Sequence, residues 1–101
     1  MGQKAPRVCT ESAAIRHLEA LIKQLPNNAA VTVEYDDGKT ASGIVCIRPT
    51  VQSFRDRDGK EGVNGVLRLE DADAPGGERR IWLDQIQRVR QRMAYAVRHA
   101  A

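Results

Sequence analysis

The stretch VTVEYDDGKTASGIV, residues 31–45, carries the clearest local fold signal in the chain. Apolar and polar residues alternate at its start, with Val31 and Val33 on one side, which is the period of a half-buried strand. The Asp-Gly pair at 37–38 is typical of a tight hairpin turn, and a second run of strand-forming residues follows it. We therefore predict an antiparallel hairpin in which Gly43 gives a bent strand the space it needs.

The same stretch contains Gly38-Lys39-Thr40, which matches the end of a nucleotide-binding P-loop. A P-loop also needs a glycine five residues before its second glycine, because a wide turn of backbone N–H groups holds the phosphates. That position is Val33, inside the predicted strand. The sequence therefore argues against a P-loop.

The composition limits the fold and the cellular setting. A chain of 101 residues with four aromatic residues allows one small domain whose core consists mainly of Val, Ile and Leu, which favours strands. Cys9 and Cys46 lack CxxC spacing, so we expect reduced thiols in a cytoplasmic protein, with Cys46 as a small buried hydrophobe. No run of about 18 apolar residues and no apolar signal segment occur, which predicts a soluble protein without membrane contact.

The positive charge is concentrated at the C-terminus. Residues 1–78 carry 10 basic and 12 acidic side chains, whereas residues 79–101 carry six arginines and a single acid, Asp84. A basic segment of this kind attracts phosphate backbones through Coulomb forces and counterion release. A solvated surface strand followed by a frayed tail is the alternative interpretation.

In the first part of the chain we predict a disordered N-terminus at residues 1–9, followed by one helix. Thr10 stands where an N-cap is expected, and the helix spans about residues 11–25 before Pro26 ends it. Its apolar residues recur at steps of three and four and form one stripe: Ala14, Ile15, Leu18, Leu21, Ile22 and Leu25.

In the remaining chain we predict strands within residues 30–92. Residues 10–92 then form a single domain, and residues 93–101 form a C-terminal tail. Pro49 falls in a long return strand, where proline is tolerated only at an edge or a bulge. We place the next turn at Asp58-Gly59 rather than at the later Asn-Gly pair. A competing interpretation makes residues 84–97 a second helix with Asp84 as its N-cap.

No constellation of catalytic or metal-binding residues stands out. Acidic residues cluster in turns, and the segment DRDGKE does not fit a calcium-binding loop. Neither cysteine has a histidine nearby in the sequence, and no serine lies in a GxSxG-like turn. We therefore expect no enzymatic activity, no metal site and no cofactor.

The hairpin residues resemble the first motif of the Sm-like (Sm/Hfq-type) superfamily, and the resemblance extends over about residues 12–91. The motif residues are Val31, Val33, Asp37, Gly38, Gly43 and Val45. The resemblance implies a mainly β fold, with an N-terminal α-helix followed by a small, strongly bent, five-stranded Sm-like (SH3-like) barrel. The whole chain is most similar to a small bacterial family of Sm-like proteins from Xanthomonas and its relatives, in which membership implies a fold and no established activity.

In ring-forming members of the superfamily, an Asp and an Asn before the third strand and an Arg-Gly pair near the fourth hold RNA. Asn64 followed by Leu67 matches the expected Asn-x-x-Leu. Lys60 stands where the aspartate is expected, and Asp84-Gln85 takes the place of Arg-Gly. The resemblance therefore carries over Asn64 alone and argues against the usual RNA pocket.

Two further groups are candidate binding residues. If its neighbours point inward, Trp82 turns outward beside Arg80, where it can stack on a base or anchor a partner. The alternative is that Trp82 packs under the N-terminal helix or in a dimer interface. Alternation along a strand also places Arg88, Arg90 and Arg92 on one face, in a row that can follow a phosphate backbone.

These residues predict a non-enzymatic Sm-like binding module, with RNA held by the arginine row as the first hypothesis. The segment RRIWLDQIQRV, residues 79–89, also looks similar to the closing strands of the small Rho-binding antiterminators. That likeness implies the alternative, a regulator that binds a protein partner. We expect a monomer or dimer rather than a ring.

Overall fold

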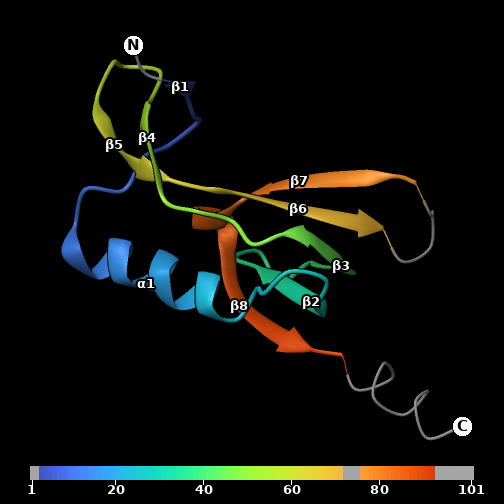
Figure 1. Cartoon of the computed structure of the whole chain (residues 1–101). Helices are drawn as coiled ribbons and strands as arrows, with labels where there is room; N and C mark the ends of the chain where they lie inside the picture. Colours follow the sequence, from blue (N-terminus) through green and yellow to red (C-terminus); the bar gives the residue numbers. More distant parts are fainter. Residues whose placement is uncertain (1–2, 72–75, 93–101) are drawn as a thin grey trace, which may run out of the picture.

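The computed structural model describes residues 3–71 and 76–92 and contains one helix beside two sheets (Figure 1). The larger sheet is antiparallel, with the strand order β7-β6-β3-β2-β8. Its strands are β2 (Ala30–Tyr35), β3 (Thr40–Ile47), β6 (Val66–Asp71), β7 (Glu78–Trp82) and β8 (Ile86–Gln91). The helix, α1 (Ser12–Lys23), precedes them in the chain.

The predicted hairpin is confirmed as β2 and β3. The turn contains Gly38 in the left-handed region, at φ 89°, and the N–H of Lys39 donates to a carboxylate oxygen of Asp37 at 3.0 Å. Gly43 lies where β3 crosses β6, and a Cβ there would collide with the carbonyl oxygen of Glu70. The absence of a side chain at residue 43 therefore allows the close approach of these two strands.

The smaller sheet is formed by the chain segment between β3 and β6 together with a short N-terminal strand. It consists of β1 (Gln3–Lys4), β4 (Gln52–Arg55) and β5 (Glu61–Asn64), in the order β1-β4-β5. Residues 48–51 separate β3 from β4 and include Pro49, which has no N–H to continue the ladder. The turn between β4 and β5 falls at Asp58-Gly59, as predicted.

The core lies between α1 and the larger sheet. Leu18, Leu21 and Leu25 are at most 1% exposed, and they pack against inward-facing residues of the strands. Val31 and Val33 of β2 are among these residues, which follows from the alternation seen in the sequence. Each Leu-to-Ala change in this cluster is expected to cost about 2–5 kcal/mol of folding free energy.

The strands form an open sheet and not the closed barrel that the resemblance implied. β7 and β8 lie at opposite ends of the strand order, and a short 3-10 helix, η1 (Leu83–Gln85), connects them. Closure requires these two edge strands to pair. The recorded pairings join β7 to β6 and β8 to β2, so both strands keep one edge free of pairing within the described residues.

The N-terminus also differs from the sequence prediction, because residues 3–9 are part of the fold. β1 pairs in parallel with β4, and Ala5 is 5% exposed. Cys9 exchanges two backbone hydrogen bonds with Val63 of β5, at 2.7 and 3.0 Å. The segment looked disordered because its partners lie about 50 residues further along the chain.

Three local features differ from the expectations drawn from the sequence. Glu11, not Thr10, is the N-cap of α1. A bulge near Cys46 turns both this residue and Ile47 toward solvent, so the prediction of a buried Cys46 is wrong. Residues 86–91 form a strand, which overturns the competing helix there, while residues 93–101 lie outside the described residues. Among the described residues, no helix has the length and apolar character needed to cross a membrane.

Candidate binding surfaces

The structure distributes the six predicted site residues over three places. Asn64 lies inside the molecule where β5 meets η1. Arg80 and Trp82 lie on β7, at one edge of the larger sheet. Arg88 and Arg90 lie on β8, at the other edge, and Arg92 directly follows that strand. The six residues therefore do not form one site.

Asn64 is fully buried, and its side-chain amide is occupied by contacts within the chain. Its Nδ2 donates to the carbonyl oxygen of Arg7 at 3.0 Å and to Oδ1 of Asp84 at 2.9 Å. Its Oδ1 accepts from the N–H groups of Gly65 at 2.8 Å and of Asp84 at 3.3 Å. A ligand would have to displace these partners, so we leave Asn64 out of the proposed interfaces.

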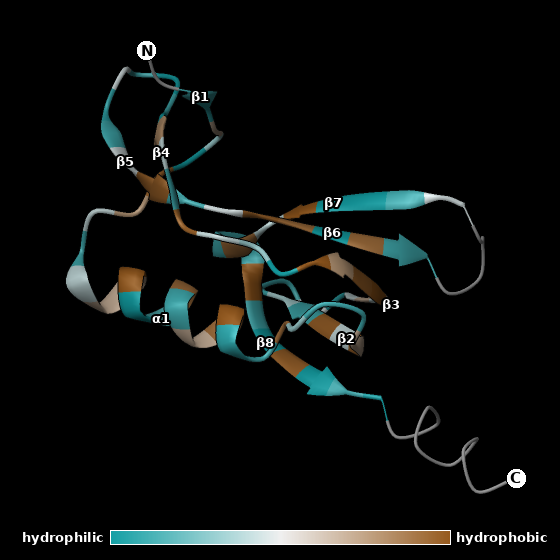
Figure 2. Ribbon diagram, viewed as in Figure 1, coloured by the Kyte–Doolittle hydropathy of each residue, from teal (hydrophilic) through white to brown (hydrophobic). Residues whose placement is uncertain are grey.

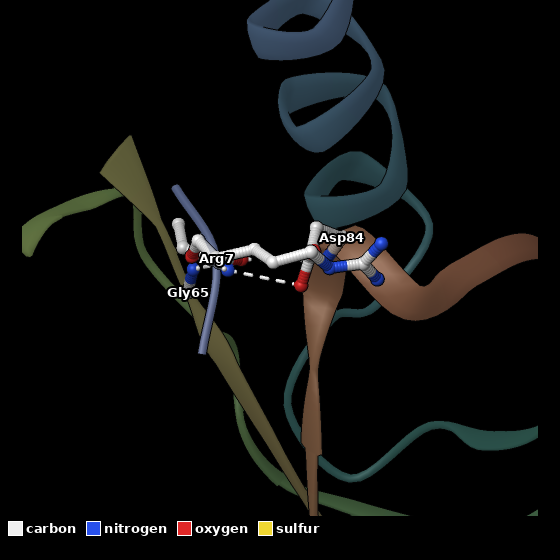
Figure 3. Close-up of polar contacts among 4 residues, drawn as sticks. Arg7, Gly65 and Asp84 are labelled. Atoms are coloured by element: carbon white, nitrogen blue, oxygen red, sulfur yellow. Dashed lines mark hydrogen bonds and ion pairs between the residues drawn. The ribbon is translucent and has the colours of Figure 1, made fainter. Parts of the chain in front are cut away.

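Asp84 connects this network to the N-terminal segment. Its Oδ2 lies 3.0 Å from Nε of Arg7, and Figure 3 shows Arg7, Gly65 and Asp84 drawn together around this point. Burial raises the pKa of the Cys9 thiol, the negative charge of Asp84 raises it further, and Arg7 opposes the rise. We call the side chains of Asn64 and Asp84, with their contacts to Arg7, the N-terminal lock, because they fasten residues 3–9 to the sheets.

The arginine row lies on an exposed face. Bands of hydrophobic and hydrophilic residues follow each other along β8 (Figure 2). Ile86 and Val89 are buried, whereas Arg88 and Arg90, on either side of Val89, are exposed. Arg88 pairs with Glu34 at 3.0 Å, whereas Arg90 lies opposite Thr32 and has no ion-pair partner among the described residues. The backbone N–H of Arg92 bonds to Ala30, so the pairing with β2 continues to this residue. We call Arg88, Arg90 and Arg92 the β8 strip.

The second cationic surface is concave. A hollow of about 240 Å³ lies where the edge strands of the two sheets meet, and a hollow of about 380 Å³ adjoins it and shares four of its lining residues. We call the two together the junction groove. The first is lined by Gln3, Lys4, Phe54, Val66, Arg80, Ile81 and Trp82, and the second adds mainly Ile47, Arg48, Pro49 and Arg68.

Trp82 occupies an intermediate place between the two predicted alternatives. It is half-buried, and its ring meets Phe54 of β4 edge-to-face, with centroids 5.2 Å apart and an interplanar angle of 81°. The ring is therefore not freely exposed, because Phe54 covers part of it. Arg80 beside it is exposed and lies 3.7 Å from Glu78.

Sequence reasoning missed the partners that complete this groove. Lys4 lies in the segment predicted to be disordered, Arg48 lies in the break at residues 48–51, and Phe54 lies in β4, whose course depends on that break. No pattern in the sequence indicated that these residues would meet Trp82. Within the part of the chain that the structure describes, no group of three potential metal ligands was found.

The fold places the chain in the Sm-like class. A crystal structure from Xanthomonas campestris, that of the protein XC5848, matches it with a TM-score of 0.85 and 41% sequence identity, over 91% of this chain and 99% of that one. That structure is described as a novel variant of the Sm-like motif. The mainly β architecture with one helix and an Sm-like strand arrangement therefore stands, as the resemblance implied.

The family match is equally extensive. Residues 2–92 match the family described as "Domain of unknown function (DUF3247)", and the chain belongs to this family. A comparison with curated proteins gave no match.

Proposed function

We propose that this protein is a non-enzymatic Sm-like binding module that contacts single-stranded RNA through the β8 strip. The observation that carries the proposal is the exposed position of Arg88 and Arg90 on one face of an edge strand. Residues two apart on a strand are separated by about 6.6 Å, a spacing that suits successive phosphates of an extended single strand. The cytoplasmic location and the bacterial origin stay predictions.

The charge of the β8 strip supports phosphate contact in preference to base recognition. The guanidinium of Arg90 has no ion-pair partner among the described residues, whereas that of Arg88 forms an ion pair with Glu34. The next two strands of the sheet, β2 and β3, present Thr32 and Ser42, whose hydroxyls bond to each other at 2.7 Å. None of these groups offers an aromatic face, so the β8 strip supports binding that depends on charge and little on sequence.

The test is the salt dependence of RNA binding. The triple variant Arg88→Gln, Arg90→Gln and Arg92→Gln is titrated against a fluorescein-labelled oligouridylate over a range of salt concentrations. Each phosphate contact on a single strand contributes about 0.7 to the slope of log K against log salt, so the slope should fall by about 2.

A matched variant separates this contact from a general loss of charge. The changes Arg16→Gln, Arg55→Gln and Arg57→Gln remove the same net charge from exposed positions on α1 and around the β4-β5 turn. We expect this variant to keep most of the wild-type slope. An unchanged slope in the β8 variant, or equal losses in both variants, would reject the β8 strip as the RNA site.

A further inference from the structure

The junction groove lies between two strands that each end a sheet. β1 is one of the two outer strands of the smaller sheet, and β7 is one of the two outer strands of the larger sheet. β7 pairs with β6 along one edge, and its other edge makes no backbone hydrogen bond within the described residues. An open strand edge is a template for an added extended chain, because its N–H and C=O groups lack partners.

The floor of the groove is apolar and closely packed. Phe54 is 3% exposed and Ile81 is 2% exposed, while Val66 and Trp82 are half-buried. In the adjoining hollow Ile47 is 57% exposed, which makes it the one large exposed hydrophobic residue of the described chain. Because Phe54 already covers part of Trp82, this floor suits an aliphatic side chain better than a flat, stacked base.

The rim of the groove is cationic. The carboxylate of Glu78 forms ion pairs with two arginines. Its Oε2 lies 2.8 Å from Nη2 of Arg68, and its Oε1 lies 3.7 Å from Nε of Arg80, so one negative charge faces two positive ones. Lys4 and Arg48 form no ion pair among the described residues. The groove therefore has a surplus of positive charge around its apolar floor, and carboxylates complement it.

A second copy of this chain fits the groove poorly. The free edges of the larger sheet that another copy would offer belong to β8, whose exposed residues include Arg88 and Arg90, and to β7, whose exposed residues include Arg79 and Arg80. Pairing either strand with β7 would bring these arginines toward Arg80 and its cationic neighbours. Like charges that face each other across an interface lower affinity, so an acidic strand is favoured over a second copy.

We propose that the junction groove binds an extended acidic segment of a partner protein. The segment pairs with the free edge of β7, places an apolar side chain against Trp82, and directs carboxylates toward Lys4 and Arg80. This inference does not depend on RNA binding by the β8 strip.

The chain carries its own reporter, because Trp82 is its single tryptophan. The probe is a capped hexapeptide with a central Leu-Val pair and two acidic residues on each side. Adjacent residues of a strand point to opposite faces, so either face presents an apolar side chain and carboxylates. We expect a saturable shift of the tryptophan emission at moderate salt. Two control peptides, one with lysines replacing the acids and one with serines replacing Leu-Val, should leave the emission unchanged.

Two matched charge-reversal variants locate the site. The pair Lys4→Glu and Arg80→Glu reverses exposed cations of the rim, and it should weaken peptide binding at least about tenfold. The pair Lys39→Glu and Arg57→Glu reverses exposed turn residues elsewhere and should leave the affinity within about threefold. Circular dichroism and thermal unfolding verify that both variants fold.

Several outcomes would overturn the proposal. One is that the lysine peptide binds as well as the acidic one, and another is that the two charge-reversal variants lose equal peptide affinity. A third is that the tryptophan emission does not respond to the acidic peptide at millimolar concentration. A response to oligouridylate without a response to the acidic peptide would assign the groove to nucleic acid. An emission change that follows protein concentration, with a dimer in light scattering, would assign it to a second copy.

Discussion

The β8 strip and the junction groove occupy opposite edges of the same sheet, and both are cationic, yet their surroundings differ. The β8 strip is a row of arginines over a paired strand, with hydroxyls and a carboxylate beside it. The groove is hollow, with an apolar floor enclosed by two sheets. Positive charge alone therefore does not determine which kind of ligand a surface binds. The shape and polarity beneath the charge separate a phosphate track from a pocket for a side chain.

The two surfaces also depend on different parts of the fold. The β8 strip is held by the pairing of β8 with β2 and by the buried Ile86 and Val89. The groove needs β1 as one wall, and β1 is fastened near the N-terminal lock. Damage to the lock should therefore affect the groove first.

The largest expected effect follows from changing Asn64→Leu. The substitution keeps the number of side-chain heavy atoms but leaves the carbonyl of Arg7, the N–H of Gly65 and a carboxylate oxygen of Asp84 without their partner. Unsatisfied buried groups of this kind should lower the free energy of unfolding by about 3 kcal/mol, measured by urea denaturation. Peptide binding should weaken more than RNA binding in the folded variant.

Asn27→Leu is the control, because its exposed side chain accepts one hydrogen bond from the N–H of Arg48. It should cost less than about 1 kcal/mol. If the two variants were equally stable, the lock would not be a major tie of the N-terminal segment. If Asn64→Leu weakened RNA and peptide binding equally, the two surfaces would share their support.

A smaller effect should distinguish two arginines within the β8 strip. Arg88 is held by Glu34, whereas Arg90 has no ion-pair partner among the described residues. A phosphate must compete with the carboxylate at Arg88 but not at Arg90. Arg90→Gln should therefore weaken oligouridylate binding by a factor of about three, and Arg88→Gln by less, in fluorescence anisotropy titrations. The reverse order would mean that RNA approaches from the side of residue 88 and displaces Glu34.

The sequence predicted those parts of the fold that depend on neighbours in the chain. The β2-β3 hairpin follows from alternation and an Asp-Gly turn, and the exposure of Arg88 and Arg90 follows from the strand period around Val89. These signals are local, so the structure that they predict does not depend on contacts with distant segments of the chain. The same alternation failed near Cys46, where a bulge reverses the side to which the residues point.

The rest depended on contacts between distant segments. Whether β7 and β8 close a barrel is decided by how the chain turns at η1. Residues 3–9 are held by strand pairing with β4 and β5 and by the contacts of Arg7 with Asn64 and Asp84. Asn64 was selected as an RNA contact by its motif, yet it bonds to the N-terminal segment. Phe54 could not be assigned to Trp82, because the path of β4 is fixed only after the break at residues 48–51.

The most direct test of separate surfaces is a competition experiment. Labelled oligouridylate is bound to the wild-type protein at moderate salt, and the acidic hexapeptide is added while both the RNA anisotropy and the Trp82 emission are recorded. Our account predicts that the emission saturates while the RNA stays bound. Displacement of the RNA in step with the change in emission would show a single shared site and contradict the account.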